Sequence, residues 1–310
     1  MRVGPLRVCA IAAVLSIAAA LARAASFADG VEVTKVPAFL NEVSGLAESP
    51  TNAGIFWVHN DSGDQPRVYA FNRTGAWLGR YTLAGATAVD WEDMAIGPAG
   101  DGRSYLYLAD IGDNSARRSS VRVYRVREPV VHTNQSPVTE TLSVVTRYDF
   151  TYPDGPRDAE GFMVDPLTGD FYVVSKQEPD GNRLYRSVSP SDQAPNTLER
   201  VGTFSTTGTT GAGISPDGLQ VLIRRYSSTI DSSSPPARAA SYWRRPDTSM
   251  SLVTLLAQPG QTVRLVAEAQ GEAIAFAADN RGFYTTAEHG SRPGESTTQA
   301  ALTFYAMVAP

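Results

Sequence analysis

The chain has 310 residues, of which 42% are hydrophobic, 9% aromatic and 19% charged, so it carries enough apolar material for a large core and is not compositionally disordered. Its 27 basic and 32 acidic residues give a formal net charge of -5, which argues against nucleic acid or an anionic membrane surface as the main partner. The single cysteine, Cys9, lies close to the start of the chain. Everything after it therefore lacks disulfides, thiol nucleophiles and cysteine-based zinc sites.

Residues 1–24 have the pattern of a secretory signal peptide. Two arginines precede an apolar stretch at residues 8–21, and residues 22–24 (Ala-Arg-Ala) match an A-x-A cleavage site. The alternative is an N-terminal membrane anchor, for which the apolar stretch is short. We therefore predict a secreted or periplasmic protein whose residues 25–310 form one domain. We expect it to be monomeric and to have no membrane span after cleavage.

Short runs rich in Val, Tyr, Phe and Thr, separated by Gly, Pro, Asp and Asn, indicate an all-β fold. One hairpin recurs: a short apolar strand, a tight turn, and a second strand rich in aromatic residues. Its five copies begin at Ser44, Glu92, Glu160, Thr210 and Glu272. Such repeats predict a β-propeller with five four-stranded blades, whereas the alternative, a β-sandwich, does not explain five copies of one hairpin. Six blades remain possible if residues 262–267 belong to a degenerate blade.

The outer strands of each blade are expected between these hairpins. For the second to fourth blades, the candidates are residues 121–126 and 142–150, 183–188 and 198–204, and 239–244 and 251–257. The fifth hairpin is followed by room for only one more strand, at residues 301–308. We therefore expect residues 31–36 to complete that blade by pairing with the C-terminal strand, which leaves no open sheet edge between the chain ends.

Acidic side chains concentrate at one face of the predicted propeller. The entry to each innermost strand and the loop between the second and third strands of a blade share this face, whereas the opposite turns carry ordinary turn residues. Aligning the repeats brings six carboxylates to the mouth of the central channel: Glu42, Asp90, Glu92, Asp158, Glu160 and Glu272. Crowded carboxylates raise one another's pKa unless a cation shares the site.

A hard, oxygen-binding cation is the simplest solution to this crowding, and Ca²⁺ accepts six to eight oxygen ligands in irregular geometry. We therefore expect Ca²⁺ as the cofactor of the mouth. The alternative is that most of these acids bind backbone N–H groups and brace neighbouring blades. The loops of the same face add candidate ligand-contacting groups, namely His59, Lys176, Arg224, Arg225 and His289. Segments 61–64 and 110–113 are interpreted as turns, and the Ser/Pro-rich residues 227–236 as an exposed loop that can act as a lid.

Four segments resemble a family of exported bacterial propeller proteins. They are residues 41–47 (Asn-Glu-Val-Ser-Gly-Leu-Ala), 57–63 (Trp-Val-His-Asn-Asp-Ser-Gly), 90–95 (Asp-Trp-Glu-Asp-Met-Ala) and 109–114 (Ala-Asp-Ile-Gly-Asp-Asn). The resemblance covers roughly residues 41–128 well and the remainder weakly.

Residues 158–162 (Asp-Ala-Glu-Gly-Phe) and 170–175 (Asp-Phe-Tyr-Val-Val-Ser) also resemble strand pairs of SdiA-regulated proteins and of calcium-dependent propeller phytases. In the phytases, such strands present carboxylates to Ca²⁺, and Lys and Arg side chains hold phosphate. The resemblance implies a metal side formed by Glu160, Glu178 and Glu272, and an anion side formed by Lys176, Arg224 and Arg225. The phytase propeller has six blades, whereas this sequence indicates five.

Two functions are compatible with these residues. The first is a binding protein that takes a small molecule, a glycan or a peptide at a Ca²⁺-containing mouth. The alternative is a metal-dependent hydrolase of phosphoesters, esters or lactones, in which a carboxylate acts as general base and the lysine and the two arginines named above stabilise negative charge. Glu160, His59 and His289 are the further catalytic candidates. The sequence contains no G-x-S-x-G, P-loop or H-E-x-x-H motif that would define the reaction.

Overall fold

A computed structural model describes residues 26–61, 63–226, 238–268, 270–289 and 298–308. The predicted signal peptide with Cys9, and the Ser/Pro-rich segment at residues 227–236, lie outside the described residues. Within the described ranges, no helix has the length and apolar character needed to cross a bilayer.

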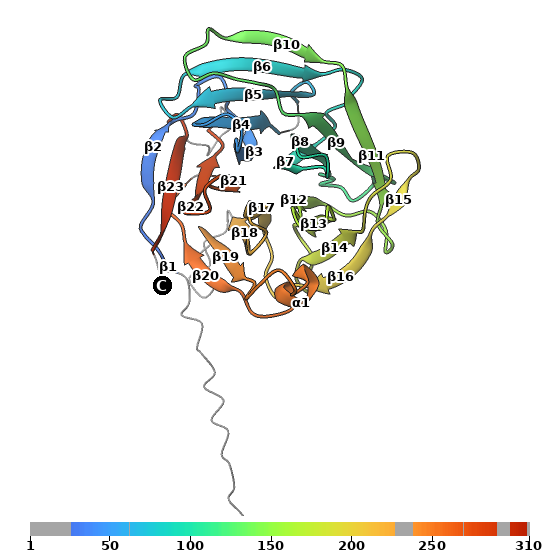
Figure 1. Cartoon of the computed structure of the whole chain (residues 1–310). Helices are drawn as coiled ribbons and strands as arrows, with labels where there is room; N and C mark the ends of the chain where they lie inside the picture. Colours follow the sequence, from blue (N-terminus) through green and yellow to red (C-terminus); the bar gives the residue numbers. More distant parts are fainter. Residues whose placement is uncertain (1–25, 62, 227–237, 269, 290–297, 309–310) are drawn as a thin grey trace, which may run out of the picture.

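Five sheets surround a central axis, which confirms the predicted five-bladed β-propeller (Figure 1). Three of the sheets have five strands instead of the predicted four. The first blade contains, from the axis outward, β3 (Val43–Glu48), β4 (Ile55–Asn60), β5 (Arg67–Asn72), β6 (Trp77–Leu83) and β10 (Val138–Leu142). The second contains β7 (Trp91–Pro98), β8 (Ser104–Asp110), β9 (Val121–Arg127), β11 (Val145–Thr151) and β15 (Asn196–Thr197). The third contains β12 (Ala159–Val164), β13 (Phe171–Ser175), β14 (Arg183–Ser187) and β16 (Glu199–Thr203).

The two remaining blades contain the last two repeats, and the fifth blade also contains both ends of the described chain. The fourth consists of β17 (Thr209–Ile214), β18 (Gln220–Tyr226), β19 (Arg238–Arg244) and β20 (Gln261–Arg264). The fifth consists of β21 (Gly271–Phe276), β22 (Gly282–Ala287) and β23 (Ala301–Val308), with β1 (Ser26–Phe27) and β2 (Val31–Lys35) added from the N-terminal side. Val31 pairs with Phe304 and Lys35 with Ala301, as expected from the strand count.

Buried apolar side chains form five clusters, and each cluster fills the space between two neighbouring blades. Aromatic contacts cross these interfaces: the rings of Phe56 and Tyr284 lie 4.9 Å apart, and those of Tyr107 and Phe171 lie 5.5 Å apart. Because each blade is covered on both faces, its inner strands are buried without the polar alternation of a half-exposed sheet. The blades therefore stack around the axis and hold the ends of their inner strands in fixed positions.

The outer strands differ in detail from the sequence predictions, and they decide between five and six blades. The predicted strand at residues 142–150 corresponds to β11, which pairs with β9 as expected, whereas residue 142 ends β10, an additional strand that pairs in parallel with β6 of the first blade. Residues 261–264 are β20, the outer strand of the fourth blade, so they do not begin a sixth blade. Residues 251–257 contain α1 (Leu252–Leu256), not a strand.

Helix α1 forms because its apolar residues have helical spacing. Leu252, Leu255 and Leu256 are buried together against the third and fourth blades, at positions i, i+3 and i+4. The Ser251 hydroxyl accepts a hydrogen bond of 3.1 Å from the Thr254 amide and thereby caps the helix.

Removing this cap gives a small, local prediction. Ser251→Ala is expected to lower the free energy of unfolding by about 1 kcal/mol, because the first turn of α1 loses its side-chain acceptor. Urea denaturation measures the change. Ser251→Asp keeps an acceptor at the same position and should restore most of the loss, and equal destabilisation by both substitutions would rule out the cap.

Candidate metal centre at the channel mouth

Five carboxylates from three blades approach one another at one end of the channel. They are Asp61 after β4, Asp90 and Glu92 at the start of β7, and Asp158 and Glu160 at the start of β12. Ligand oxygens of Asp61, Asp90 and Glu92 all lie within 4.8 Å of one another, and so do those of Glu92, Asp158 and Glu160. Glu92 belongs to both groups, so the two form one continuous acidic cluster.

A β-bulge at the same position of each inner strand explains why the cluster forms. The pairing register shifts between Trp91 and Asp93 in β7, and between Ala159 and Gly161 in β12, so that Glu92 and Glu160 are the extra residues. The other inner strands have equivalent shifts, at Ser44, Thr210 and residues 272–273. A bulge re-aims a side chain that would otherwise follow the regular alternation. The positions that align between the sequence repeats are therefore the positions of the β-bulges in the structure.

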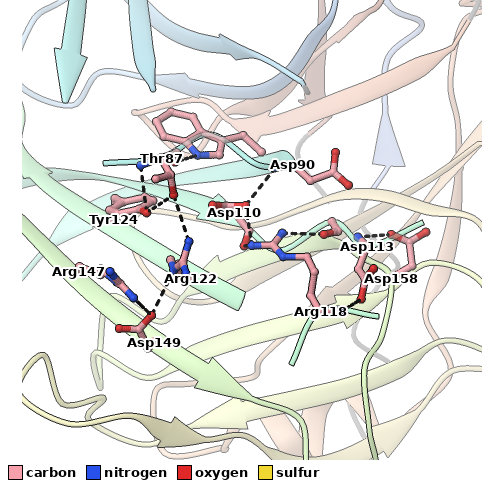
Figure 2. Close-up of polar contacts among 12 residues, drawn as sticks. Thr87, Asp90, Asp110, Asp113, Arg118, Arg122, Tyr124, Arg147, Asp149 and Asp158 are labelled. Atoms are coloured by element: carbon pink, nitrogen blue, oxygen red, sulfur yellow. Dashed lines mark hydrogen bonds and ion pairs between the residues drawn. The ribbon is translucent and has the colours of Figure 1, made fainter. Parts of the chain in front are cut away.

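The loop between β8 and β9 supports the cluster from the second blade (Figure 2). Arg118 forms an ion pair of 2.8 Å with Asp110 and donates to the Gly112 carbonyl oxygen at 2.7 Å. The Asp113 amide donates to Asp158 Oδ1 at 3.0 Å. These contacts fit the interpretation of segment 110–113 as a turn, and they also orient one carboxylate of the cluster.

Gly112 leaves the space that two of the carboxylates occupy. A methyl group on this residue would overlap Glu92 Oε1 and lie 2.6 Å from Asp90 Oδ2. Any larger residue would therefore push both carboxylates away from their present positions. The absence of a side chain here allows the backbone to approach the acids closely.

Lys176 is the cation that contacts the cluster directly. Its ammonium group forms an ion pair with Glu160 Oε1, while Glu160 Oε2 is buried and has no hydrogen-bond partner among the described residues. Although burial works in the opposite direction, the charges of Glu160 and Glu272 raise the pKa of Lys176, so it is charged at neutral pH. Lys176, together with the charge of Arg118 that acts on Asp90, offsets only part of the charge of five carboxylates.

The remaining acids are therefore difficult to ionise together. Burial raises the pKa of Glu92 and of Glu160 well above the usual value, and the nearest carboxylates reinforce the effect. Burial and the charges of Asp61 and Asp158 raise the pKa of Asp90 to about 6. Both causes penalise the charged form, and a bound cation would relieve both.

Two predicted members of the cluster lie outside these groups. Glu272 is buried, and its pKa is raised by burial while Lys176 and Arg224 counteract the shift. Glu42 lines a separate pocket beside the first blade together with Asp64 and Arg67.

The two predicted arginines differ in their surroundings. Arg224 is buried and donates to the carbonyl oxygens of Ala273 at 2.7 Å and Thr286 at 2.6 Å, and it forms an ion pair with Glu268. These bonds join the fourth and fifth blades, so its donors serve the fold. Arg225 is partly buried, which lowers its pKa, and its Nε has no partner among the described residues.

Among the described residues, neither of the two predicted histidines belongs to the acidic cluster. His59 is fully buried; its Nδ1 lies 2.9 Å from the Asn60 carbonyl oxygen, its ring packs against Trp91, and burial lowers its pKa. It is therefore neutral at pH 7 and part of the core. The His289 amide donates to the Asn41 carbonyl oxygen at 2.8 Å, which ties the end of β22 to the segment before β3.

Asp93 is a buried acid that sequence reasoning missed. One of its oxygens accepts the amides of Phe162 and Ala212, both at 2.9 Å, and the other accepts the Met94 amide at 2.8 Å. Phe162 belongs to the third blade and Ala212 to the fourth, so one carboxylate from the second blade joins three blades across the axis. Bracing by backbone N–H groups, which we considered for the mouth acids, is the role of Asp93.

Comparison with known proteins gives neither a family nor a function for this chain. No protein-family profile and no curated protein sequence matches this chain. Among solved structures, Kuenenia stuttgartiensis hydrazine synthase is 16% identical with a TM-score of 0.41, covering 86% of this chain and 63% of that chain. A nidogen/laminin complex is 12% identical (TM-score 0.46; 80% and 73% covered), and a glucose dehydrogenase is 10% identical (TM-score 0.46; 89% and 99% covered). This chain thus spans less than two thirds of the hydrazine synthase chain, and similarity at this level carries no argument about activity.

Proposed function

We propose that this propeller binds Ca²⁺ through Asp61, Asp90 and Glu92 and uses the ion to hold a small polar ligand, glycan or peptide at the channel mouth. The observation that carries the proposal is the approach of these three carboxylates to within 4.8 Å of one another over Gly112. All three donors are oxygens, which suits a hard cation. Because Ca²⁺ takes six to eight ligands, three carboxylates leave positions for water and for a ligand.

This group is a better cation site than the neighbouring one that contains Glu160. Lys176 already pairs with Glu160, so a cation placed beside that pair would face a positive charge. In the described part of the chain, no ion pair is formed between Lys176 and either Asp90 or Glu92, although Glu92 is close enough to influence the pKa of Lys176 and Arg118 acts on Asp90 from a distance. If the protein is exported, as its first 24 residues predict, even a site of millimolar affinity would be filled, as in extracellular calcium-binding modules.

A metal-dependent hydrolase remains the second candidate, and Asp90 is the residue that favours it. Asp90 is only half-buried, so its carboxylate can contact a substrate or an attacking water at the mouth. This function predicts turnover of phosphoester, ester or lactone substrates that stops in EDTA and in Asp90→Asn. If none of these classes is turned over by the folded protein with Ca²⁺ present, the binding function stands alone.

Calorimetric titration of the EDTA-treated, dialysed protein with CaCl₂ tests the site. We expect saturable binding that weakens about tenfold or more in Glu92→Gln, which removes a charged ligand common to both groups. Gly112→Ala should weaken binding as well, because the added methyl group displaces Glu92 and Asp90.

Asp149→Asn is the matched control, because Asp149 is also a paired acid of the second blade but contacts Arg122 and Arg147 instead of the cluster (Figure 2). Its Ca²⁺ affinity should equal that of the unmodified protein. Absence of binding at millimolar Ca²⁺, or equal affinity for Glu92→Gln and the control, would overturn the proposal.

A further inference from the structure

The end of the channel opposite the acids contains an apolar cavity of about 320 Å³. All five inner strands contribute to it, so it lies on the propeller axis. Its apolar wall includes Leu46, Met94, Ile96, Val164, Ile214 and Phe276. Sequence reasoning dismissed this face because its turns carry ordinary turn residues, but the inner strands and these turns together line a cavity.

Asp93 separates this cavity from the acidic cluster. It follows Glu92 of the cluster directly and precedes Met94 of the cavity wall. Its carboxylate accepts the amides of Met94 and Ala212, both of which line the cavity. The two ends of the channel therefore differ in chemistry: carboxylates gather at one end, and apolar side chains line the other.

Two glycines keep the apolar compartment open. A methyl group placed on Gly97 would meet no atom within 4 Å, and one placed on Gly213 would meet nothing closer than 3.8 Å. Neither glycine has a positive φ, so a side chain at either position needs no unusual backbone conformation. Each position can therefore accept a Cβ atom without a clash, and a larger side chain placed there would take up part of the cavity.

The charge available at the rim of the cavity is positive. Glu48 also lines it, but its carboxylate is occupied by an ion pair with Arg73 and by the Ala278 amide at 2.9 Å. Arg103 has a side chain that is 59% exposed, and its ion pair with Asp101 is long, at 3.7 Å. A ligand with one anionic group could therefore reach Arg103 while the rest of it lies against the apolar wall.

We propose that this cavity binds a small amphiphile with an apolar body and a single carboxylate, such as a medium-chain fatty acid. The apolar body leaves water for the space enclosed by the inner strands, and burial of that surface drives binding. The carboxylate pairs with the Arg103 guanidinium at the rim. This site is independent of the Ca²⁺ proposed at the other end, from which Asp93 separates it.

Titration calorimetry with octanoate tests the proposal, in EDTA and again with Ca²⁺. We expect saturable binding of equal affinity in both buffers. Gly213→Leu and Gly97→Leu should each weaken binding about tenfold or more, since displacing two methylenes of the ligand from the cavity has an effect of that size. Arg103→Gln should weaken octanoate binding and leave the binding of octanol unchanged.

Gly202→Leu is the matched control, because a methyl group on this outer-strand glycine would also meet nothing closer than 3.7 Å, and it lies outside the cavity. It should bind octanoate like the unmodified protein, and circular dichroism should show the same β spectrum for all variants.

Absence of octanoate binding by the unmodified protein, or an equal loss of binding in Gly202→Leu and Gly213→Leu, would overturn the proposal. Equal binding of octanoate and octanol would reject the role of Arg103. Loss of Ca²⁺ binding at the mouth would leave these results unaffected.

Discussion

Asp93→Ala is expected to lower the free energy of unfolding by about 3–5 kcal/mol, which is a large share of the stability of a typical domain. The substitution removes the acceptor of the Phe162 and Ala212 amides, which lie on inner strands of two other blades. Both amides would remain buried on the axis, and a buried unpaired N–H costs about 1–3 kcal/mol. The small cavity left by the side chain adds to the loss.

Chemical denaturation monitored by tryptophan fluorescence measures this effect. Asp93→Asn keeps one acceptor oxygen in place but presents an NH₂ group to an amide, so we expect an intermediate loss. Asp149→Ala, which removes a partly exposed acid from the same blade, should cost about 1 kcal/mol or less. If Asp93→Ala and Asp149→Ala were equally stable, the bridging role assigned to Asp93 would be incorrect.

The two inner strands of each blade could be predicted from the sequence because they form a hairpin whose residue pattern is local and repeated. Two short strands joined by a tight turn recur five times, and each copy corresponds to an observed hairpin. The outer edges follow no such pattern. The pairing of β10 with β6 depends on where a long connection passes, and its residues are mostly exposed, so nothing in their spacing identifies the partner.

The candidate site was predictable to the extent that it follows the repeat register. Aligning the copies placed Asp90, Glu92, Asp158 and Glu160 together because the same bulge occurs in every inner strand. Asp61 was not predicted as a member of the cluster, although its loop lies on the same face, because its Asp-Ser-Gly-Asp segment is also typical of a turn. Its approach to Asp90 and Glu92 depends on the fold of the neighbouring blade, which the sequence repeat does not specify.

The same register also contains residues that brace the blades instead of contributing charge. The Ser44 hydroxyl donates to the Glu92 carbonyl oxygen, and the Thr210 hydroxyl donates to the Gly271 carbonyl oxygen at 2.9 Å. Both bonds connect adjacent blades. Hydroxyl residues at two of the five bulges therefore connect adjacent blades, while the carboxylates at the other bulges create a negative charge that a cation would neutralise.

In EDTA, the thermal stability of the protein is expected to fall as the pH rises from about 5 to about 7.5. The pKa of Asp90 is about 6 in the folded protein against 3.8 for an ordinary aspartate, and burial also raises the pKa of Glu92 and of Glu160 above 4.5. At these three carboxylates, and at Asp93, whose pKa burial also raises, the folded state therefore binds more protons than the unfolded chain in this range. Buried His59, whose pKa is lowered, acts in the opposite direction, but it is one site against four. The contribution of such a group to stability is complete below its unfolded pKa and is lost as the pH rises through its folded pKa.

Calcium should reverse this trend, because an ion at the mouth stabilises the ionised carboxylates. At pH 7.5 we expect added Ca²⁺ to raise the midpoint of thermal unfolding by at least about 3 °C relative to EDTA, and at pH 5 to change it much less. Differential scanning calorimetry across this range measures both curves. Glu92→Gln, which removes one buried charge, should be less sensitive to pH in EDTA and should respond weakly to Ca²⁺, whereas Asp149→Asn should follow the unmodified protein. Two results would contradict this prediction: a midpoint of thermal unfolding in EDTA that rises between pH 5 and 7.5, or one that falls equally in Glu92→Gln. Either would show that these carboxylates are not the source of the instability, and the physical reason for placing a cation among them would be lost.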